Sequence, residues 1–476
     1  MPQQCELNNI HLSRSIVTGI VVSIDVAVIV TCGYALFYTY LDGDPDLFPR
    51  YTAVIALHTL LTIQAFNTAE LYRFNNIVQP PQHARIIPVI CATIFLVIIA
   101  IGFALKISAE FSRGWSLAWI LSSTSLLWFA RFAVKTTVRK AALAGKLARN
   151  IVIYGAGERG ERLIRQIEKT NEPWNRVVGV FDDRFDQTAP NIAGYPFLGN
   201  LNDLLKYGRI NRSDEVLIAL PWSSETRILE IVRILAALPA NIRVSSDIMG
   251  QNLLRHGVTF KYGIPMLNVL DKPVTGWGAL SKQCIDLGVA GVAALFAMPL
   301  VAIIALAIRL ESKGPILFRQ KRYGFNNQVI EVYKFRSMYS DMVDADAEKL
   351  TTRNDARVTK VGAFLRRTSL DELPQLLNVL KGEMSVVGPR PHAMKAKAAG
   401  KLYEDVVAGY AIRHKVKPGM TGWAQVNGWR GNTKTEQDII GRLQHDLYYI
   451  SNWSIALDLY IILRTFKVLI SAENAY

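Results

Sequence analysis

Long runs of uncharged, apolar residues constrain this chain more than any other feature. Each of the first four runs is near the ~20 residues that a helix needs to cross a bilayer. The sequence therefore predicts a bundle of four transmembrane helices within residues 1–149. Asp25 lies inside the first run and is expected to make a polar contact within this bundle. The four runs are Ile16–Tyr40, Tyr51–Thr68, Ile86–Ile107 and Trp115–Val134.

Charged residues between these runs set the expected orientation. The loop at 42–50 is mostly acidic, whereas the next loop carries Arg73 and Arg85, and the segment after the fourth run is rich in Lys and Arg. Because cytoplasmic loops are enriched in Lys and Arg, both ends of the bundle are expected in the cytoplasm. The net charge of +15 could also attract nucleic acid, but beside apolar spans anionic lipid is the better-matched partner, so no nucleic acid is expected.

Residues 150–271 follow the pattern of a separate α/β domain. Predicted strands alternate with predicted helices, which is typical of a parallel, Rossmann-like sheet. The strands are Ile151–Tyr154, Val177–Phe181 and Val216–Leu220, and the helices are Glu161–Lys169 and Thr226–Leu238.

A glycine-rich turn links the first of these strands to its helix. Gly155, Gly157 and Gly160 have dinucleotide-fingerprint spacing, and Asp182 and Asp183 follow about 20 residues later, where an acid would bind ribose hydroxyls. An NAD(P)-dependent dehydratase or oxidoreductase is therefore an alternative function. The chain contains no Tyr-x-x-x-Lys pair, which the commonest such enzymes use as their base. The glycines could instead only permit close packing of the helix on the strand.

A fifth apolar run extends from Ile285 to Arg309, with Pro299 near its centre. Proline bends a helix, so this run is either a kinked full span or a helix that enters and leaves on the cytoplasmic side. The second alternative predicts a re-entrant helix over about 284–310. Near the C-terminus, Trp453–Ile470 is apolar but carries charges, and it could lie on the membrane surface or pack in a core.

Two adjacent carboxylates, Asp371 and Glu372, stand at the expected start of a helix over Asp371–Leu380. Ser369 and Glu372 have capping-box spacing, so the acids could simply cap that helix. A further helix is expected over Asp438–Ile450.

Basic residues surround this pair in the sequence and favour a chemical role for it. Guanidinium groups bind phosphate oxygens in a bidentate fork, and a diphosphate beside two carboxylates calls for Mg²⁺, with Mn²⁺ as the substitute. An aspartate could then attack phosphorus through an acyl-phosphate intermediate. The candidate phosphate or nucleotide ligands are Arg322, Lys334, Arg336, Arg366, Pro389, Arg390, Pro391 and Arg430, and the candidate metal ligands are Asp371 and Glu372.

The last 200 or so residues resemble the monotopic phosphoglycosyl transferases of bacterial polysaccharide initiation. The four-span bundle and the Rossmann-like domain resemble the large subgroup of that family. Within it, Gly428–Gly431 and Asn474–Tyr476 are similar to the undecaprenyl-phosphate glucose phosphotransferases of colanic-acid-type exopolysaccharide and capsule synthesis. The stretches that carry the family resemblance are Arg309–Pro315, Tyr333–Met338, Thr368–Leu376, Gly388–Pro391 and Lys417–Gly428.

The resemblance implies a reaction and a location. Asp371 would attack the β-phosphorus of a UDP-sugar, UMP would leave, and undecaprenyl phosphate would take the sugar phosphate. Glu372 would bind metal or deprotonate the acceptor, Arg366 would hold a phosphate, and Pro389–Pro391 would shape the pocket. Pro299 would mark the re-entrant helix, although Met298 replaces the small polar residue common before that proline.

The expected architecture is thus a membrane protein with three parts. Residues 1–149 form the bundle, 150–271 the Rossmann-like domain, and 272–476 an α/β catalytic domain on the cytoplasmic face of the bacterial inner membrane. A homo-oligomer is also compatible with this pattern. The competing hypotheses are the NAD(P)-dependent enzyme and a scaffold that only organises other glycan enzymes.

Overall fold

The chain divides into two compact units, Ile10–Ala148 and Arg149–Tyr476. The predicted division into three domains, including the boundary at 271–272, stays a prediction. The computed structural model describes residues 13–78, 85–143, 147–170, 172, 174–184, 191–245, 258–262, 264–340, 355–392, 397–398, 401–402, 407, 409–429, 431 and 435–470.

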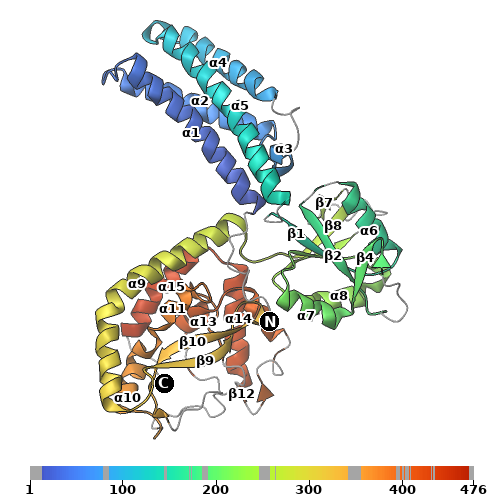
Figure 1. Cartoon of the computed structure of the whole chain (residues 1–476), viewed down its shortest axis with the longest axis vertical. Coiled ribbons are helices and arrows are strands. Elements are labelled where there is room, and N and C mark those ends of the chain that lie inside the picture. The colour runs from blue at the N-terminus through green and yellow to red at the C-terminus, as the bar shows by residue number, and fades with distance from the viewer. Residues whose placement is uncertain are drawn as a thin grey trace. The chain divides into compact units, whose positions relative to one another are not determined.

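The first unit is a helical bundle that matches the four predicted apolar runs (Figure 1). The indole N–H groups of Trp115 and Trp119 donate to the carbonyls of Gly33 and Ile29, which joins the last long helix to the first. Gly33 allows the second long helix to approach, because an added Cβ would lie 2.7 Å from Ile55 Cδ1. The helices are α1 (Arg14–Tyr40), α2 (Phe48–Thr68), short α3 (Phe74–Val78), α4 (Ile86–Ala104) and α5 (Arg113–Leu143), with a 3₁₀ turn at Ser108–Glu110.

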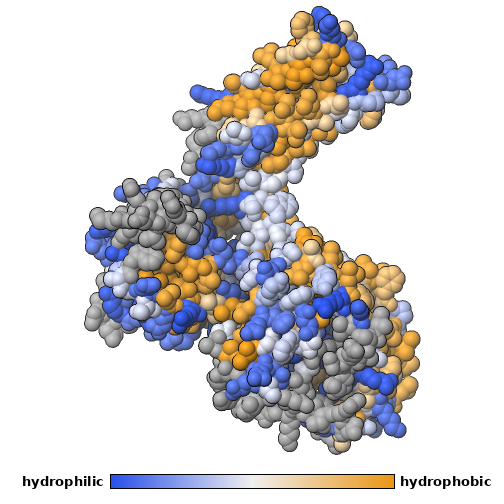
Figure 2. Space-filling view, turned by 180° about the vertical axis from the view of Figure 1, so that it is seen from behind, coloured by the Kyte–Doolittle hydropathy of each residue, from blue (hydrophilic) through white to orange (hydrophobic). Residues whose placement is uncertain are grey.

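Four helices in the described part of the chain are long and apolar enough to cross a membrane, namely α1, α4, α5 and α9 (Gly276–Glu311) of the second unit. Figure 2 shows the corresponding apolar surface over the bundle. The predicted span at Tyr51–Thr68 is confirmed as a helix, but α2 is not in this set. Its polar residues, such as His58 and Gln64, lower its hydropathy, so its passage across the membrane stays a prediction.

Asp25 makes the polar contact that was predicted for it. Its side chain is buried between helices, and one oxygen, Oδ2, lies 2.5 Å from Arg131 Nη2 and 3.0 Å from the Tyr72 hydroxyl. An ion pair with a hydrogen-bonded partner reduces the cost of a charge at this depth.

The second unit begins with a mixed eight-stranded sheet in the order β3-β4-β2-β1-β5-β6-β8-β7. Strands β4, β2, β1, β5 and β6 run parallel, as predicted from the strand–helix alternation. The strands are β1 (Arg149–Tyr154), β2 (Asn175–Phe181), β3 (Asn191–Ile192), β4 (Tyr195–Gly199), β5 (Glu215–Ile218), β6 (Asn241–Ser245), β7 (Val258–Lys261) and β8 (Ile264–Leu270). The helices are α6 (Glu158–Lys169), α7 (Leu201–Ile210) and α8 (Glu225–Leu235), with a 3₁₀ turn at Trp222–Ser224.

The prediction of a wholly parallel sheet was wrong at both edges. Strand β3 pairs antiparallel with β4, β7 pairs antiparallel with β8, and β8 pairs antiparallel with β6. A short connection can join only antiparallel neighbours, and the chain turns sharply between β7 and β8, where Tyr262 has a φ of +55°.

The rest of the second unit is built on α9 and a β-hairpin, β9 (Leu317–Tyr323) and β10 (Val329–Phe335), joined by the 3₁₀ turn Phe325–Asn327. The predicted helix Asp371–Leu380 begins later than expected, at Gln375, and Asp438–Ile450 is confirmed within α14. The elements are α10 (Lys360–Thr368), the 3₁₀ turn η7 (Leu370–Glu372), α11 (Gln375–Leu380), β11 (Ser385–Val387), β12 (Lys397–Ala398), β13 (Lys401–Leu402), η8 (Tyr410–Lys415), β14 (Gly419–Thr421), α13 (Trp423–Val426), α14 (Glu436–Ser451) and α15 (Ile455–Ile470).

Trp453–Ile470 was predicted either to pack in a core or to lie on the membrane surface, and helix α15 tests the first of these. One face is buried at Asp458 and Ile461, so the helix does pack in a core. The opposite face exposes Leu463 and Phe466, and its contact with a membrane stays a prediction.

Helix α9 continues through Pro299 without interruption. Figure 1 shows it changing direction as it follows the outside of the second unit. Near its start, Asp286 Oδ1 accepts hydrogen bonds from Ser385 Oγ and the Val386 amide at 2.9 and 3.0 Å. At its end, Glu311 accepts from the Val361 amide at 3.1 Å. Asp286 and the C-terminal Glu311 are therefore both held by the same folded unit, while several apolar side chains between them are exposed.

Candidate active site

A tight turn between two helices positions the carboxylate pair. Helix α10 ends at Thr368, and Ser369 adopts a left-handed conformation with φ +59° that reverses the chain into η7. Ser369 makes no side-chain capping hydrogen bond. The capping box predicted for Ser369 and Glu372 is therefore not formed, and the Glu372 carboxylate is held by other groups.

Those groups are two cations from distant parts of the chain. Lys334, on β10, places Nζ 2.7 Å from Glu372 Oε1 and 3.9 Å from Asp371 Oδ2. Arg390, which follows β11, donates from Nη1 to Glu372 Oε2 at 3.1 Å and from Nη2 to Oε1. The two parallel N–H donors bind the carboxylate as a fork, which fixes its direction as well as its charge. The Glu372 carboxylate is thus paired with two cations, Lys334 and Arg390. In these contacts Asp371 is paired only with Lys334, at the longer distance of 3.9 Å.

Burial and these charges move the two carboxyl groups in opposite directions. Burial raises the pKa of Asp371, and the negative charge of Glu372 adds to this, while Lys334 and Arg366 oppose it. Burial alone would also raise the pKa of Glu372, but Arg390 and Lys334 outweigh it and hold that pKa well below its usual range. Such a split between paired carboxyls is typical of sites where the two groups have different chemical roles.

The cations around the pair are themselves held in place. Burial and the charge of Arg390 lower the pKa of Arg322 to about 10, which leaves it charged at neutral pH. Arg322 Nη1 donates to the Pro391 carbonyl at 2.7 Å, and its Nε donates to Gln320 Oε1 at 3.1 Å. The Pro389 carbonyl accepts from the Gly419 amide at 3.0 Å. The segment Pro389–Pro391 is therefore fixed on both sides of Arg390.

A buried amide that sequence analysis missed aligns Lys334. Asn378 accepts a hydrogen bond from the Tyr333 amide at 3.0 Å and donates to the Glu331 carbonyl at 2.7 Å. These bonds satisfy the edge of β10 that β9 does not cover, one residue before Lys334. An asparagine in a short apolar helix was the available signal, because Ser, Thr, Asn and Asp compete with helix hydrogen bonds.

A second missed group supports Arg390 from behind. The guanidinium group of Arg413 donates to the Arg390 carbonyl at 2.7 Å and pairs with Asp446 at 2.7 Å. Arg413 and Asp446 are both almost fully buried. No local pattern identified them, because the two residues lie on different elements and meet only in the fold.

Not every predicted ligand lies among these groups. Arg336 directs its guanidinium donors to the end of α9, with bonds of 2.8 Å to the Ser312 carbonyl and 3.1 Å to the Lys313 carbonyl. It forms no hydrogen bond with either carboxylate in the described structure, so its assignment as a phosphate ligand has no geometric support. Arg430 lies outside the described residues. Arg366 does influence the site, since its charge lowers the pKa of Asp371.

The donor set suits magnesium in a limited way. No group of three or more His, Cys, Asp or Glu side chains that could hold a metal occurs among the described residues. Magnesium, however, needs only one or two protein carboxylates when substrate phosphates and water complete its shell. The carboxylate oxygens of Asp371 and Glu372 keep lone pairs beyond those used by Lys334 and Arg390, so the pair fits this ion.

The glycine-rich turn is occupied by the protein's own groups. Gly155 has a φ of +119°, and a Cβ on Gly160 would lie 2.0 Å from the Gly155 carbonyl oxygen, so both glycines are required for packing. Asp182 accepts a hydrogen bond from the Ala156 amide at 2.8 Å and pairs with Arg184 at 2.9 Å. Asp183, the second acid expected to bind ribose, accepts from the Leu201 amide at 3.1 Å and pairs with Arg227, so both acids are engaged within the protein. Gly157 alone has space beside it, with Arg184 Nη2 at 3.8 Å from a built Cβ.

Comparisons with known proteins identify the family of the chain's C-terminal part and several relatives. Residues 277–472 match the bacterial sugar transferase family, and residues 68–246 match a CoA-binding domain family. The chain is 38% identical over 361 residues to the undecaprenyl-phosphate glucose phosphotransferase of Komagataeibacter xylinus, covering 75% of this chain and 66% of the relative. It is 40% identical over 319 residues to the UDP-glucose:undecaprenyl-phosphate glucose-1-phosphate transferase of Escherichia coli K12, covering 67% of each.

A third relative extends the match along the chain. The UDP-glucose:undecaprenyl-phosphate glucose-1-phosphate transferase of Xanthomonas campestris pv. campestris is 33% identical over 376 residues, covering 78% of this chain and 77% of the relative. The family match contains Lys334, Asp371, Glu372 and Arg390, the residues that the fold brings together. The chain therefore belongs to the bacterial sugar transferase family.

Proposed function

We propose that the protein transfers glucose 1-phosphate from UDP-glucose to undecaprenyl phosphate, which yields undecaprenyl-diphosphate-glucose and UMP. The observation that carries this proposal is the position of Asp371 beside a carboxylate already neutralised by Lys334 and Arg390. The names of the relatives support the donor and the acceptor. The product would start exopolysaccharide synthesis on the membrane.

The chemistry divides into two displacements at one phosphorus atom. A carboxylate oxygen of Asp371 attacks the β-phosphorus of UDP-glucose, the bond from that phosphorus to the bridging oxygen breaks, and UMP leaves. The sugar phosphate is then held as an acyl-phosphate on Asp371. A phosphate oxygen of undecaprenyl phosphate attacks the same phosphorus, which releases the Asp371 carboxylate and forms the new diphosphate.

The surrounding side chains have separate tasks in these steps. Lys334, Arg390 and Arg366 offset negative charge that develops on the transferring and leaving oxygens. Glu372 either removes a proton from the acceptor phosphate or shares a metal with Asp371. Magnesium bound by these carboxylates would supply a Lewis acid for the diphosphate.

Helix α9 supports a location at the cytoplasmic headgroup layer of the inner membrane. A straight helix of its 36 residues would be about 54 Å long, more than the ~30 Å hydrocarbon core. Asp286 and Glu311 of α9 hydrogen-bond to the same folded unit, whereas Phe296, Met298 and Ile303 between them are 62–79% exposed. These features favour a re-entrant helix that bends near Pro299, with the Rossmann-like domain in the cytoplasm.

The test combines donor choice with detection of the intermediate. Membranes that contain the protein are incubated with UDP-glucose, UDP-galactose, UDP-N-acetylglucosamine or UDP-N-acetylgalactosamine, with and without undecaprenyl phosphate, and UMP is measured. The expected result is acceptor-dependent UMP release with UDP-glucose, and a hexose-phosphate adduct on the Asp371 peptide when the acceptor is omitted. Product formation without any adduct would contradict the covalent mechanism. UMP release only with a donor other than UDP-glucose would contradict the assignment of glucose as the transferred sugar.

A further inference from the structure

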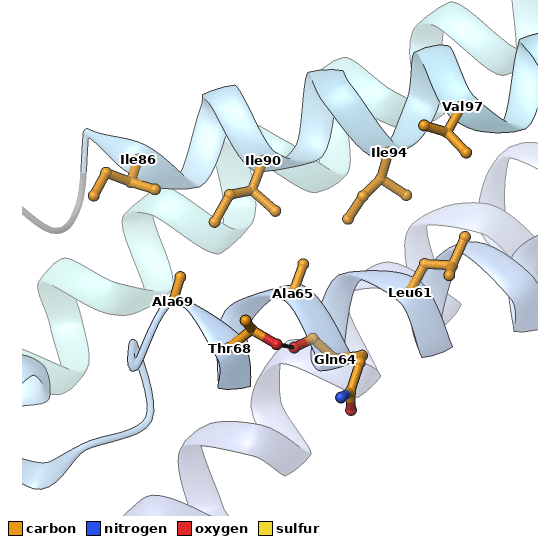
Figure 3. A pocket seen from close by; sticks show the side chains of 9 residues that line it. All are labelled: Leu61, Gln64, Ala65, Thr68, Ala69, Ile86, Ile90, Ile94 and Val97. Atoms are coloured by element: carbon orange, nitrogen blue, oxygen red, sulfur yellow. Dashed lines mark hydrogen bonds between the residues drawn. The ribbon is translucent and has the colours of Figure 1, made fainter.

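The bundle contains an open apolar groove that the proposed reaction does not use. It lies between α2 and α4 and encloses about 630 Å³. Figure 3 shows the α4 side chains directed across the groove toward the facing side of α2. The lining residues are Leu61, Gln64, Ala65, Thr68 and Ala69 of the α2 side, with Ile86, Ile90, Ile94 and Val97 of α4.

The groove follows from the side chains that the two helices present to each other. Ile86, Ile90, Ile94 and Val97 recur at three- and four-residue spacing and form one face of α4. They stand opposite Ala65 and Ala69, which are too small to fill the space between the helix axes. Thr68 Oγ1 donates to the Gln64 carbonyl at 3.0 Å within its own helix, so this hydroxyl needs no partner from a ligand.

The length of the groove matches one leaflet of a bilayer. From Ile86 to Val97 the rise along α4 is about 17 Å, and half of the hydrocarbon core is about 15 Å. A chain that enters at Ile86 would therefore end near the middle of the membrane at Val97. This length suits an acyl chain of one leaflet.

The end of the groove at Ile86 is positively charged. Arg85 is exposed, directly precedes Ile86 and forms the N-cap of α4, whose first turn contains no acidic residue. Arg73, at the same end of the bundle, is paired with Glu70 at 2.8 Å, whereas Arg85 stands directly at the groove. The N-terminus of a helix also favours anions through its free N–H groups.

We infer that this groove binds one acyl chain of an anionic phospholipid, whose phosphate contacts Arg85 and the first turn of α4. The apolar walls take the chain, the single-leaflet length sets its depth, and the charge at the mouth selects the headgroup. The site is independent of the transferase reaction, because none of its residues belongs to the catalytic unit.

Native mass spectrometry of the full-length protein tests the site. The protein is released from nanodiscs that contain equal amounts of phosphatidylglycerol and phosphatidylethanolamine, with undecaprenyl phosphate as a third lipid. Ala65→Phe fills the groove, and Leu60→Phe, on the exposed side of the same helix, is the matched control. We expect retained phosphatidylglycerol to fall at least fivefold in Ala65→Phe and to stay unchanged in Leu60→Phe.

Arg85→Gln tests the headgroup separately. This variant should keep a bound lipid but lose the preference for phosphatidylglycerol over phosphatidylethanolamine. Equal retention in Ala65→Phe and wild type, no headgroup preference in wild type, or preferential retention of undecaprenyl phosphate would each overturn the assignment. If Ala65→Phe does not fold, a phosphatidylglycerol with a diazirine on its acyl chain provides the readout in wild type. Crosslinks should then map to peptides that contain Leu61–Ala69 or Ile86–Val97, and crosslinks elsewhere would reject the site.

Discussion

The glycine-rich turn and the carboxylate site each contain an acid beside an arginine, but they are built differently. At the turn, Asp182 pairs with Arg184, two residues away, and accepts a hydrogen bond from the Ala156 amide of the glycine-rich turn, 26 residues before it. At the carboxylate site, Glu372 binds Lys334 and Arg390, which lie 38 residues before and 18 residues after it.

The origin of the paired charges distinguishes the site of the proposed reaction from the glycine-rich turn. The cation that pairs with Asp182 comes from the same loop, and its bond to the Ala156 amide closes the glycine-rich turn, so a well-formed motif is satisfied within the protein. The contacts of Glu372 bring charge from separate elements. Burial raises the pKa of its neighbour Asp371, and Lys334 Nζ lies at a longer 3.9 Å from Asp371 Oδ2. Long-range convergence of charge on one buried acid is thus a better indicator of the reaction here than the spacing of glycines.

Asp371→Asn should produce the largest difference in activity between a variant of the carboxylate site and its control at the glycine-rich turn. The amide keeps the shape of the side chain but cannot attack phosphorus, so UMP release should fall by at least about 10³-fold. Asp182→Asn, at the buried acid of the glycine-rich turn, is the control and should retain most activity. Comparable losses in both variants, with both proteins folded, would remove the distinction between the sites.

Arg390→Ala should have the next largest effect. Removal of the fork that holds Glu372 should lower UMP release by about 10²-fold, the usual scale for one preorganised donor. Arg184→Ala removes the arginine partner at the glycine-rich turn and should change activity less than about threefold, because the Arg184 guanidinium group is largely exposed and Asp182 keeps its bond to the Ala156 amide. Arg390→Lys should be intermediate, since it keeps the charge but loses the two-donor geometry.

The pH profile should report the opposed shifts of the two carboxyl groups. Asp371 must be ionised to attack, and its pKa is raised, so UMP release should decline on the acid side above the ordinary aspartate value of about 3.9. Lys334 lowers the pKa of Asp371, so Lys334→Gln should move this acid limb to higher pH. Rates of adduct formation measured across pH check the direction. A shift to lower pH in Lys334→Gln would contradict the assignment.

Asn378→Ala should affect stability and activity together. The change leaves the Tyr333 amide and the Glu331 carbonyl without their buried partner, which should cost about 1–3 kcal/mol of the free energy of unfolding. Misplacement of Lys334 should lower UMP release by about 10-fold. Thermal unfolding and UMP assays measure the two effects. Glu383→Gln keeps a hydrogen-bond acceptor for Asn378 and is the control that should preserve activity.

Gly157→Ala should give the smallest effect. Its φ of −78° suits any residue, and the added methyl would meet only the end of Arg184, so unfolding free energy should change by less than about 0.5 kcal/mol. Gly160→Ala should instead cost about 3 kcal/mol, because its Cβ would strike the Gly155 carbonyl. A loss of UMP release in folded Gly157→Ala would mean that the turn binds a ligand required for the reaction.

Local patterns allowed much of the architecture to be predicted. The apolar runs and the strand–helix alternation depend on neighbours in sequence, and the structure confirms the helices and the parallel core of the sheet. The antiparallel edges were missed because strand direction there depends on how short the connection is. The alternation of predicted strands and helices does not give the lengths of the connections where the strands are short and irregular.

The charged residues of the site could be predicted from their chemistry, but the buried residues that hold them in place could not. Asp371, Glu372, Lys334 and Arg390 were identified by chemistry, and the fold joins them. Arg336 carries the same guanidinium group as Arg390, two residues from Lys334, yet it binds the end of α9. Asn378 had a local signal, an asparagine in a short apolar helix, but its partners lie 45 and 47 residues away. Asp446 was missed because its partner Arg413 lies on a different element.

The spacing of Lys334 and Arg336 has a mechanical consequence. Only Phe335 separates them, and its buried ring packs with Ile304 and Ile308 of α9. Residues 334–336 therefore connect the C-terminal part of α9, the helix proposed to enter the lipid, to the ammonium group of Lys334, which lies 3.9 Å from Asp371 Oδ2. Stretching or thinning of the surrounding bilayer would then be transmitted to the chemical step as a displacement of charge, so that membrane thickness itself becomes a variable of turnover.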